Sequence, residues 1–228
     1  MYNRKSFWLS VLVIGSIGIT IPSVARAEVL VAQKRSTSQV RQLLNEGRRL
    51  VNARDYNGAI SVYQQAATLE PKNGSIFSGI GYLYAQQGNF SAALAAYRRA
   101  VALSPNNSDY HYALAYVSGN MGDNNKAKTA YRKAIQLNRN NVNAYLGLAA
   151  ILLNLREFEN AKWAFEEAMK IDPRNPKAHE LKGAMLMKQG RSREAIMELK
   201  KSLNLYETQK KWEGVSRVDS MLRELGGA

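Results

Sequence analysis

Two observations predict an all-α fold, a solenoid built from repeated helical hairpins. The first is a repeat: the stretch Ala96–Asn107 (AYRRAVALSPNN) has near copies at Val62–Asn73, Ala130–Asn141 and Ala164–Asn175, so the period is 96 minus 62, or 34 residues. The second is the spacing of apolar residues by three and four, as on one face of a helix. A fixed period of about 20 to 50 residues is typical of solenoids, whose units bury their apolar faces only against neighbours.

Each unit is predicted to contain two helices and two turns. The first helix is followed by a turn near sequences such as NFSA and DNNK, and the second helix by a turn such as SPNN or DPRN. Pro71, Pro105 and Pro173 end the second helix in three units, because proline lacks the amide donor that a continuing helix needs. Positions are counted from the first residue of each unit, and the units are 40–73, 74–107, 108–141, 142–175 and 176–209.

Small residues recur at the positions where the two helices of a unit must approach closely. We expect the large side chain at position 24 to fill the space beside the small residues at positions 8 and 20. Replacing Ala93 or Ala127 with leucine should therefore overpack the contact. Position 8 is Gly47, Gly81, Ala115, Ala149 or Gly183; position 20 is Ala59, Ala93, Ala127, Ala161 or Ala195; position 24 is Tyr63, Tyr97, Tyr131, Phe165 or Leu199.

With this period and these landmarks, the units resemble tetratricopeptide repeats. The resemblance covers residues 40 to about 209, five consecutive units, and implies a right-handed superhelical solenoid of tetratricopeptide hairpins. It also implies a concave surface that holds a peptide of a partner protein. Units three and five depart from the pattern, with Arg139 and Glu207 where proline is expected and Leu199 in place of the aromatic residue.

The two ends of the chain differ from the repeats. Residues 1–27 combine a positive start, an apolar stretch and an Ala-Arg-Ala ending, which is typical of a signal peptide cleaved after Ala27; a retained membrane anchor is the alternative. Either one places the rest of the chain on the extracytoplasmic side of a membrane, in a periplasm or a lumen. We expect residues 28–39 to be a flexible lead, and residues 210–228 to be a capping helix and tail, because Trp212 and later apolar residues share one helical face.

Composition and charge narrow the classes of partner. The chain has no cysteine, which excludes disulfides and thiolate metal sites. Its net charge is +14, and without Arg4, Lys5 and Arg26 it is 29 minus 18, or +11. In the cytosol such a charge would first suggest nucleic acid, but the predicted export argues against that partner. Membrane head groups and acidic proteins remain as polyanionic partners.

By resemblance, positions 2, 5, 9, 12 and 13 of each unit face the concave groove. Three tyrosines there lie beside amide side chains, and together these groups suit a partner's apolar side chains and backbone. Alternatively, the tyrosines pack between adjacent first helices, and the amides satisfy free carbonyls at the helix ends. The candidate groove residues are Arg48, Asn52, Tyr82, Gln86, Tyr112, Tyr116, Asn120, Leu146, Asn154 and Lys188.

Positions 25 and 26 of the second helix are expected on the outer, convex side. They are basic in units two, three and five, and we interpret them as a solvated face or as a docking stripe for an acidic or membrane surface. Unit four carries Glu166 and Glu167 instead, so the chain could also associate with itself through opposite charges that salt would screen. The basic stripe consists of Arg98, Arg99, Arg132, Lys133, Lys200 and Lys201.

The sequence predicts no catalytic, metal or cofactor site. His111 and His179 both occupy position 4, but they lie two repeats apart, roughly 20 Å or more, which is too far to share a metal ion. Each is expected to replace an aromatic core residue. No nucleophile elbow or phosphate-binding loop is present in the sequence.

The sequence therefore predicts a non-catalytic scaffold for protein–protein interaction. Membrane-associated tetratricopeptide proteins often help to assemble envelope or photosynthetic complexes, or tether biosynthetic enzymes, and the layout of this chain is similar. The alternatives are a self-associating structural protein and a binder of polyanions or membrane surfaces through the basic convex face. The partner protein itself is not identified by any motif.

Overall fold

The computed structural model describes the backbone of residues 23–226 and the side chains of residues 37–226. The chain divides into two compact units, Met1–Gln39 and Val40–Ala228. Within the described residues all eleven elements are α-helices and no strand occurs. The all-α prediction is confirmed.

The helices follow one another as hairpins. Helix α1 (Ser23–Asn52) supplies the first helix of the first repeat from Val40 on, and α11 (Trp212–Glu224) follows the last repeat. The helices between them are α2 (Tyr56–Leu69), α3 (Gly74–Gln86), α4 (Phe90–Leu103), α5 (Ser108–Asn120), α6 (Asn124–Leu137), α7 (Val142–Asn154), α8 (Phe158–Ile171), α9 (Pro176–Lys188) and α10 (Ser192–Thr208).

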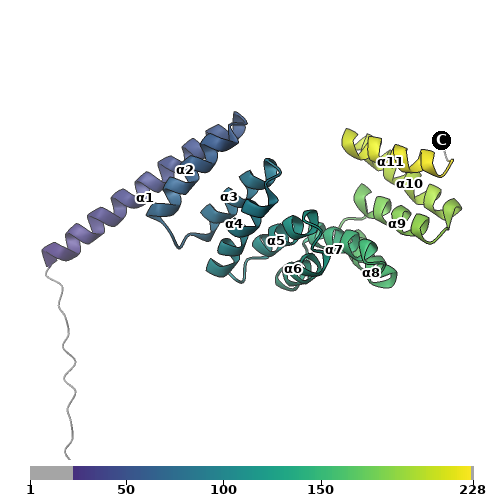
Figure 1. Cartoon of the computed structure of the whole chain (residues 1–228), viewed down its shortest axis with the longest axis horizontal. Helices are drawn as coiled ribbons and strands as arrows, with labels where there is room; N and C mark the ends of the chain where they lie inside the picture. Colours follow the sequence, from purple (N-terminus) through teal and green to yellow (C-terminus); the bar gives the residue numbers. More distant parts are fainter. Residues whose placement is uncertain (1–22, 227–228) are drawn as a thin grey trace, which may run out of the picture. The chain divides into compact units, whose positions relative to one another are not determined.

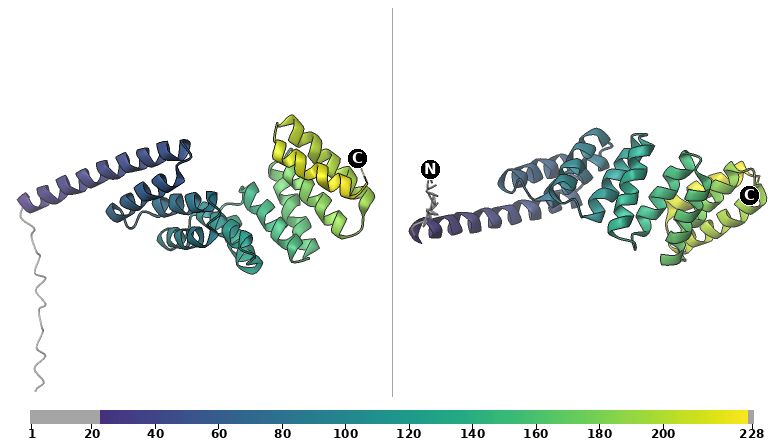
Figure 2. Two further views of the ribbon diagram at one scale, coloured as in Figure 1. Left: turned by 45° about the horizontal axis from the view of Figure 1, so that its top comes forward. Right: turned by 90° about the horizontal axis from the view of Figure 1, so that it is seen from below.

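Packing within the unit Val40–Ala228 runs between neighbours in the sequence (Figures 1 and 2). From α2 onward each helix contacts the next one, and the first helices α3, α5, α7 and α9 also contact one another in that order. Each hairpin therefore buries apolar surface against the hairpins next to it, as the fixed period requires.

The turn inside each hairpin uses a left-handed backbone at position 15. Gly88, Gly122 and Gly190 have φ between +73° and +82° there, whereas Arg54 and Arg156 have φ of 60° and 59° at the same position of units one and four. The next backbone N–H then donates to a carbonyl five residues earlier, for example from Asp123 to Ser118 at 3.0 Å. This is the hydrogen bond of a Schellman motif, and it satisfies a carbonyl that the end of the helix leaves free.

Asparagine caps the next first helix at the turn between hairpins. Its side-chain oxygen accepts a hydrogen bond from a backbone N–H two or three residues further on, as from Ala144 to Asn141 at 3.0 Å. In unit three, where Arg139 replaces proline, the cap at Asn141 is present and α6 still ends at Leu137. The four caps are Asn73, Asn107, Asn141 and Asn175.

The close approach expected at positions 8 and 24 is present. The Tyr63 ring lies between Gly47 of its own unit and Gly79 of the next, where a Cβ atom built on Gly79 would lie 2.8 Å from the ring. Tyr97 lies in the same way against Gly81, at 3.0 Å from a Cβ built there. The rings therefore leave room only for a small residue at these positions, and glycine fits without displacing them.

Helix α11 caps the C-terminal end of the repeats through a buried carboxylate. Glu180 on α9 accepts hydrogen bonds from Arg217 Nε at 2.7 Å and from the Tyr206 hydroxyl at 2.7 Å. Lys177 Nζ lies 2.6 Å from the same carboxylate. Burial opposes ionisation of Glu180, but these donors outweigh it and lower its pKa. Val218 and Leu222 complete the contact as buried apolar residues.

The N-terminal part of the chain departs from the prediction. The expectation that residues 28–39 form a flexible lead was wrong, because they are helical within α1; from Ser23 to Glu46 the sequence has neither glycine nor proline, so nothing interrupts the helix. Residues 1–22, most of the expected signal peptide, lie outside the described residues. Among the described helices, none has the length and apolar character needed to span a bilayer.

Candidate peptide-binding surface

Tyrosines of α3 and α5 form the most prominent exposed aromatic group among the expected groove residues. Tyr82 and Tyr116 are 49% and 47% exposed, and they are therefore available for contact with a partner. Tyr112 is half-buried, and its ring centroid lies 5.9 Å from that of the buried Tyr131. Tyr82 and Tyr116 thus fit the interpretation as partner-binding residues, whereas Tyr112 is partly used in packing between helices. We call Tyr82, Tyr112 and Tyr116 the tyrosine surface.

The hydroxyl groups of this surface are close enough to affect one another. Burial, together with the charges of Tyr82, Tyr112 and Tyr116 on ionisation, raises the pKa of Tyr97 on α4 to about 12. The same effects, burial first and Tyr116 second, raise the pKa of Tyr112. A tyrosine hydroxyl can both donate and accept hydrogen bonds, so the surface offers a partner polar contacts of either kind.

The amide side chains at position 13 are exposed in the first four units. Asn120 donates from Nδ2 to the carbonyl oxygen of Tyr116 at 2.8 Å, so this amide does satisfy a carbonyl at the end of α5. Its Oδ1 atom is still an acceptor at the edge of the tyrosine surface. The column consists of Asn52, Gln86, Asn120 and Asn154.

The other expected groove residues divide into exposed and buried. Arg48 and Lys188 are exposed, and Arg48 donates to Asn45 Oδ1 at 3.2 Å. Leu146 is only 6% exposed and belongs to the core around α7, so its assignment to an open groove was wrong. The reason is that α7 is apolar nearly all round and is covered by neighbouring hairpins, which bury a position that is half-buried in α3 and α5, at Ser78 and Tyr112.

The basic stripe is exposed in most of its length but is not uniform. Arg98, Arg132 and Lys200 are exposed, whereas Arg99 lies over the Phe77 ring at 5.7 Å. Lys201 forms an ion pair with Glu198 at 3.2 Å. Lys133 is half-buried beside His111. Position 26 therefore lies near position 4 of the same unit, although Arg99 and Lys201 are still exposed to solvent.

The two histidines have separate environments. His111 Nε2 donates to the carbonyl oxygen of Pro105 at 2.8 Å, and His179 Nδ1 donates to Glu198 Oε2 at 2.8 Å. Throughout the part of the chain that the structure describes, no group of three or more His, Cys, Asp or Glu side chains could hold a metal ion. The histidines thus bond to a neighbouring turn and to the second helix of a repeat.

The repeated hairpins, their glycine turns and their exposed tyrosines define a tetratricopeptide-type repeat protein. Residues 51–207 match the family described as "Cilia and flagella-associated protein 70 middle TPR-like domain", and the chain belongs to this tetratricopeptide family. Proteins of this fold are in general interaction scaffolds without catalytic activity of their own. A comparison with curated protein sequences finds no match to this chain.

Solved structures show the same architecture. A crystal structure of MamA superposes with a TM-score of 0.65 at 25% identity, covering 72% of this chain and 96% of that one. MamA 41-end from Desulfovibrio magneticus RS-1 has a TM-score of 0.69 at 18% identity, with 75% and 97% covered. YrrB, described as a TPR protein with an unusual peptide-binding site, has a TM-score of 0.64 at 18% identity, with 84% and 97% covered. These likenesses establish tandem hairpins packed as a tetratricopeptide solenoid.

Proposed function

We propose that this chain is a non-catalytic scaffold that binds a peptide segment of a partner protein on the tyrosine surface. The observation that carries this proposal is the exposure of Tyr82 and Tyr116 by about half, on two adjacent repeats and beside exposed amides. Large aromatic side chains that remain exposed with a polar hydroxyl at the tip are enriched at the centres of protein interfaces. The peptide-binding site described for YrrB is consistent with this proposal.

We further propose that the scaffold acts outside the cytosol or at a membrane, where it assembles or tethers envelope or membrane-bound complexes. The sequence of residues 1–27, with a positive start, an apolar stretch and a small-residue ending, supports this part. Mass spectrometry of the N-terminus in native membrane and soluble fractions tests it. A mature chain beginning at Glu28 supports cleavage, an intact chain in the membrane supports an anchor, and an intact soluble chain contradicts both.

The surface itself is tested with a double variant, Tyr82→Ala and Tyr116→Ala. Tyr112 is left unchanged because it packs on Tyr131, and its removal would disturb the hairpin contact between α5 and α6. The full chain with an affinity tag, the double variant and a control, Met197→Ala, are used to recover partners from the native membrane fraction. Met197 is 58% exposed on α10, away from the tyrosines, and so matches the loss of exposed apolar area.

The expected result is a discrete protein that binds the full chain and the Met197→Ala variant but is at least about tenfold depleted with the double variant. Circular dichroism should show the same helical content and melting curve for all three proteins. Equal recovery of every bound protein by the double variant would contradict the assignment of the tyrosine surface as the binding site.

A further inference from the structure

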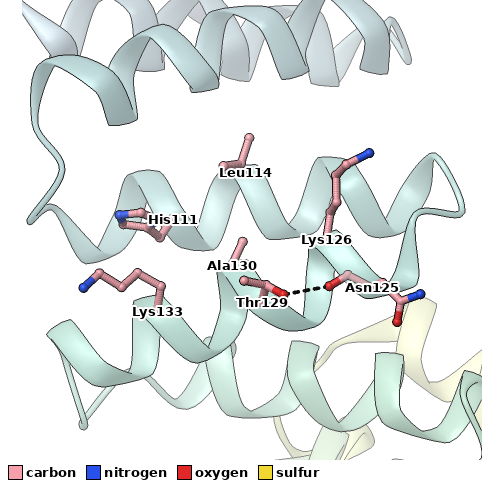
Figure 3. A pocket seen from close by; sticks show the side chains of 7 residues that line it. All are labelled: His111, Leu114, Asn125, Lys126, Thr129, Ala130 and Lys133. Carbon is pink, nitrogen blue, oxygen red and sulfur yellow. Dashed lines mark hydrogen bonds between the residues drawn. The ribbon is translucent and has the colours of Figure 1, made fainter.

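Helices α5 and α6 line an open, shallow pocket of about 540 Å³ that the tyrosine surface does not use. Its floor is apolar, with His111 at one end and lysine side chains at the rim (Figure 3). Because successive residues of a helix are turned by about 100°, His111 and Leu114 lie on other faces of α5 than Tyr112 and Tyr116. The lining residues include His111, Leu114, Lys126, Thr129, Ala130 and Lys133.

The fourth repeat fills the equivalent place with its own indole ring. Trp163 stands at position 22, where the third repeat has Thr129, and Tyr145 stands at position 4, where the third repeat has His111. The Trp163 and Tyr145 rings contact edge to face, with centroids 5.7 Å apart. An indole is thus compatible with the geometry of this hairpin at this position.

The fifth repeat places a carboxylate at this site, and its own hairpin still lines a pocket of about 300 Å³ there. Glu198 stands at position 23, where the third repeat has Ala130. It accepts a hydrogen bond from His179 at position 4, at 2.8 Å, and from Lys201 at position 26, at 3.2 Å. The third repeat keeps the histidine and the lysine, as His111 and Lys133, but has no acid at position 23 between them.

The third repeat therefore has neither the indole of the fourth repeat nor the carboxylate of the fifth. Thr129 and Ala130 replace the indole and the carboxylate, and Thr129 Oγ1 is bonded to the backbone of its own helix, at Asn125 O. Among the ion pairs of the described residues none involves Lys133, whose Nζ donates to Gln136 Oε1 at 3.2 Å. An apolar cleft with an ammonium at its rim that has no acidic partner suits an aromatic side chain followed by an acid.

This chain exposes such a pair at its C-terminal helix. Trp212, the first residue of α11, is 64% exposed, the most exposed of the large hydrophobic residues that the structure describes. The exposed Glu213 follows it directly. The buried apolar residues that hold α11 on the repeats are Val218 and Leu222, and Trp212 is not among them.

We propose that the pocket of the third repeat receives Trp212 and Glu213 of a second copy of this chain. The indole would fill the place that Trp163 fills in the fourth repeat, and the Glu213 carboxylate would pair with Lys133 as Glu198 pairs with Lys201. The two contacting patches differ, so the interface is heterologous, and each copy still offers one free pocket and one free tryptophan. Association therefore continues with concentration unless a ring closes. This inference goes beyond the proposed function, because it uses a different face.

A complementary pair of variants tests the proposal. Thr129→Trp blocks the pocket with the residue of the fourth repeat but keeps Trp212, whereas Trp212→Ala removes the inserting side chain but keeps the pocket. Neither full-length variant should associate with itself. Fluorescence anisotropy of labelled Thr129→Trp titrated with Trp212→Ala should show a complex with one copy of each, at least about tenfold tighter than Thr129→Trp titrated with itself.

Exchange of charges supplies a second test that does not depend on filling the pocket. Adding Lys133→Glu to the Trp212→Ala chain should weaken the mixed complex, and adding Glu213→Lys to the Thr129→Trp chain should restore it. The Tyr82→Ala/Tyr116→Ala variant should associate with itself as the unmodified chain does, which separates this site from the tyrosine surface. The proposal is overturned if the mixed pair binds no tighter than either variant alone, or if the charge exchange restores nothing.

Discussion

Replacing Glu198 with glutamine should remove a pH-dependent part of the stability of the fifth repeat. The Glu198 carboxylate is buried between α9 and α10, where it accepts hydrogen bonds from His179 Nδ1 at 2.8 Å, Lys182 Nζ at 3.0 Å and Lys201 Nζ at 3.2 Å. Burial opposes ionisation, but the hydrogen bonds and the lysine charges outweigh it and lower the pKa of Glu198 from 4.5 to about 2. The folded chain therefore stabilises the charged form.

The size of the effect follows from this fall in pKa. At about 1.4 kcal/mol for each pH unit, a fall from 4.5 to about 2 corresponds to at most about 3.5 kcal/mol in the free energy of unfolding, and solvent screening of the partly exposed lysine partners makes the measured loss smaller. Because the folded pKa lies below the unfolded one, this stability is present above pH 4.5 and is lost as the pH falls from 4.5 to about 2. The Glu198→Gln variant should lose most of this charge-dependent stability near neutral pH, and should differ little from the unmodified chain near pH 2.

The loss of unfolding free energy is measured by urea unfolding followed by circular dichroism. The unmodified chain and Glu198→Gln are compared at neutral pH and near the pKa of Glu198 in the folded chain. Since repeat arrays can unfold in steps, amide hydrogen exchange in α9 and α10 gives a local measure of the same loss. Glu194→Gln is the matched control, because Glu194 lies on the same helix in an exposed ion pair with Arg191 and should change stability much less. A deficit of Glu198→Gln that is equal at both pH values would refute a charge-dependent role.

Two further substitutions probe the repeat itself. Ala127→Leu should lower the free energy of unfolding by about 1 to 3 kcal/mol, because Ala127 is fully buried against α5. An unchanged thermal melting curve would show that the contact can expand to accept the larger side chain. Gly122→Ala should cost about 1 kcal/mol from backbone strain alone, since φ is +82° and no atom lies within 4 Å of a Cβ built there. Arg156→Gly at the equivalent turn should not destabilise; equal destabilisation of both in urea titrations would contradict the strain argument.

Much of the fold could be predicted because a tetratricopeptide unit is a local structure. The helices, their turns and the position of Tyr63 against a small residue all follow from side chains within one period and the next. The asparagine caps were not predicted, although Asn73, Asn107, Asn141 and Asn175 recur at position 34 and an asparagine before an apolar helical run is a capping signal. The helical state of residues 28–39 was not predicted either, although the segment contains no glycine or proline that would interrupt a helix.

The candidate site depended more on the tertiary structure. Resemblance to the family assigned equal status to Tyr82, Tyr112, Tyr116 and Leu146, but the structure leaves two of them exposed, half-buries one and buries the last. Exposure at a given repeat position depends on how large the side chains of the adjacent hairpins are, and that differs from unit to unit. The buried Glu180, which joins α9 to α11, likewise has its partner Arg217 37 residues away.

The sequence by itself determined the period, the five hairpins and the close contacts between helices, because each of these is set by residues at short, fixed separations. Only the tertiary structure decided which positions are filled and which are open. Thr129 and Ala130 differ from Trp163 and Glu198 in ways that the sequence alone makes plain. Small residues at these two positions leave a pocket only if no other side chain of α5 or α6 fills the space, and this can be seen only in the tertiary structure.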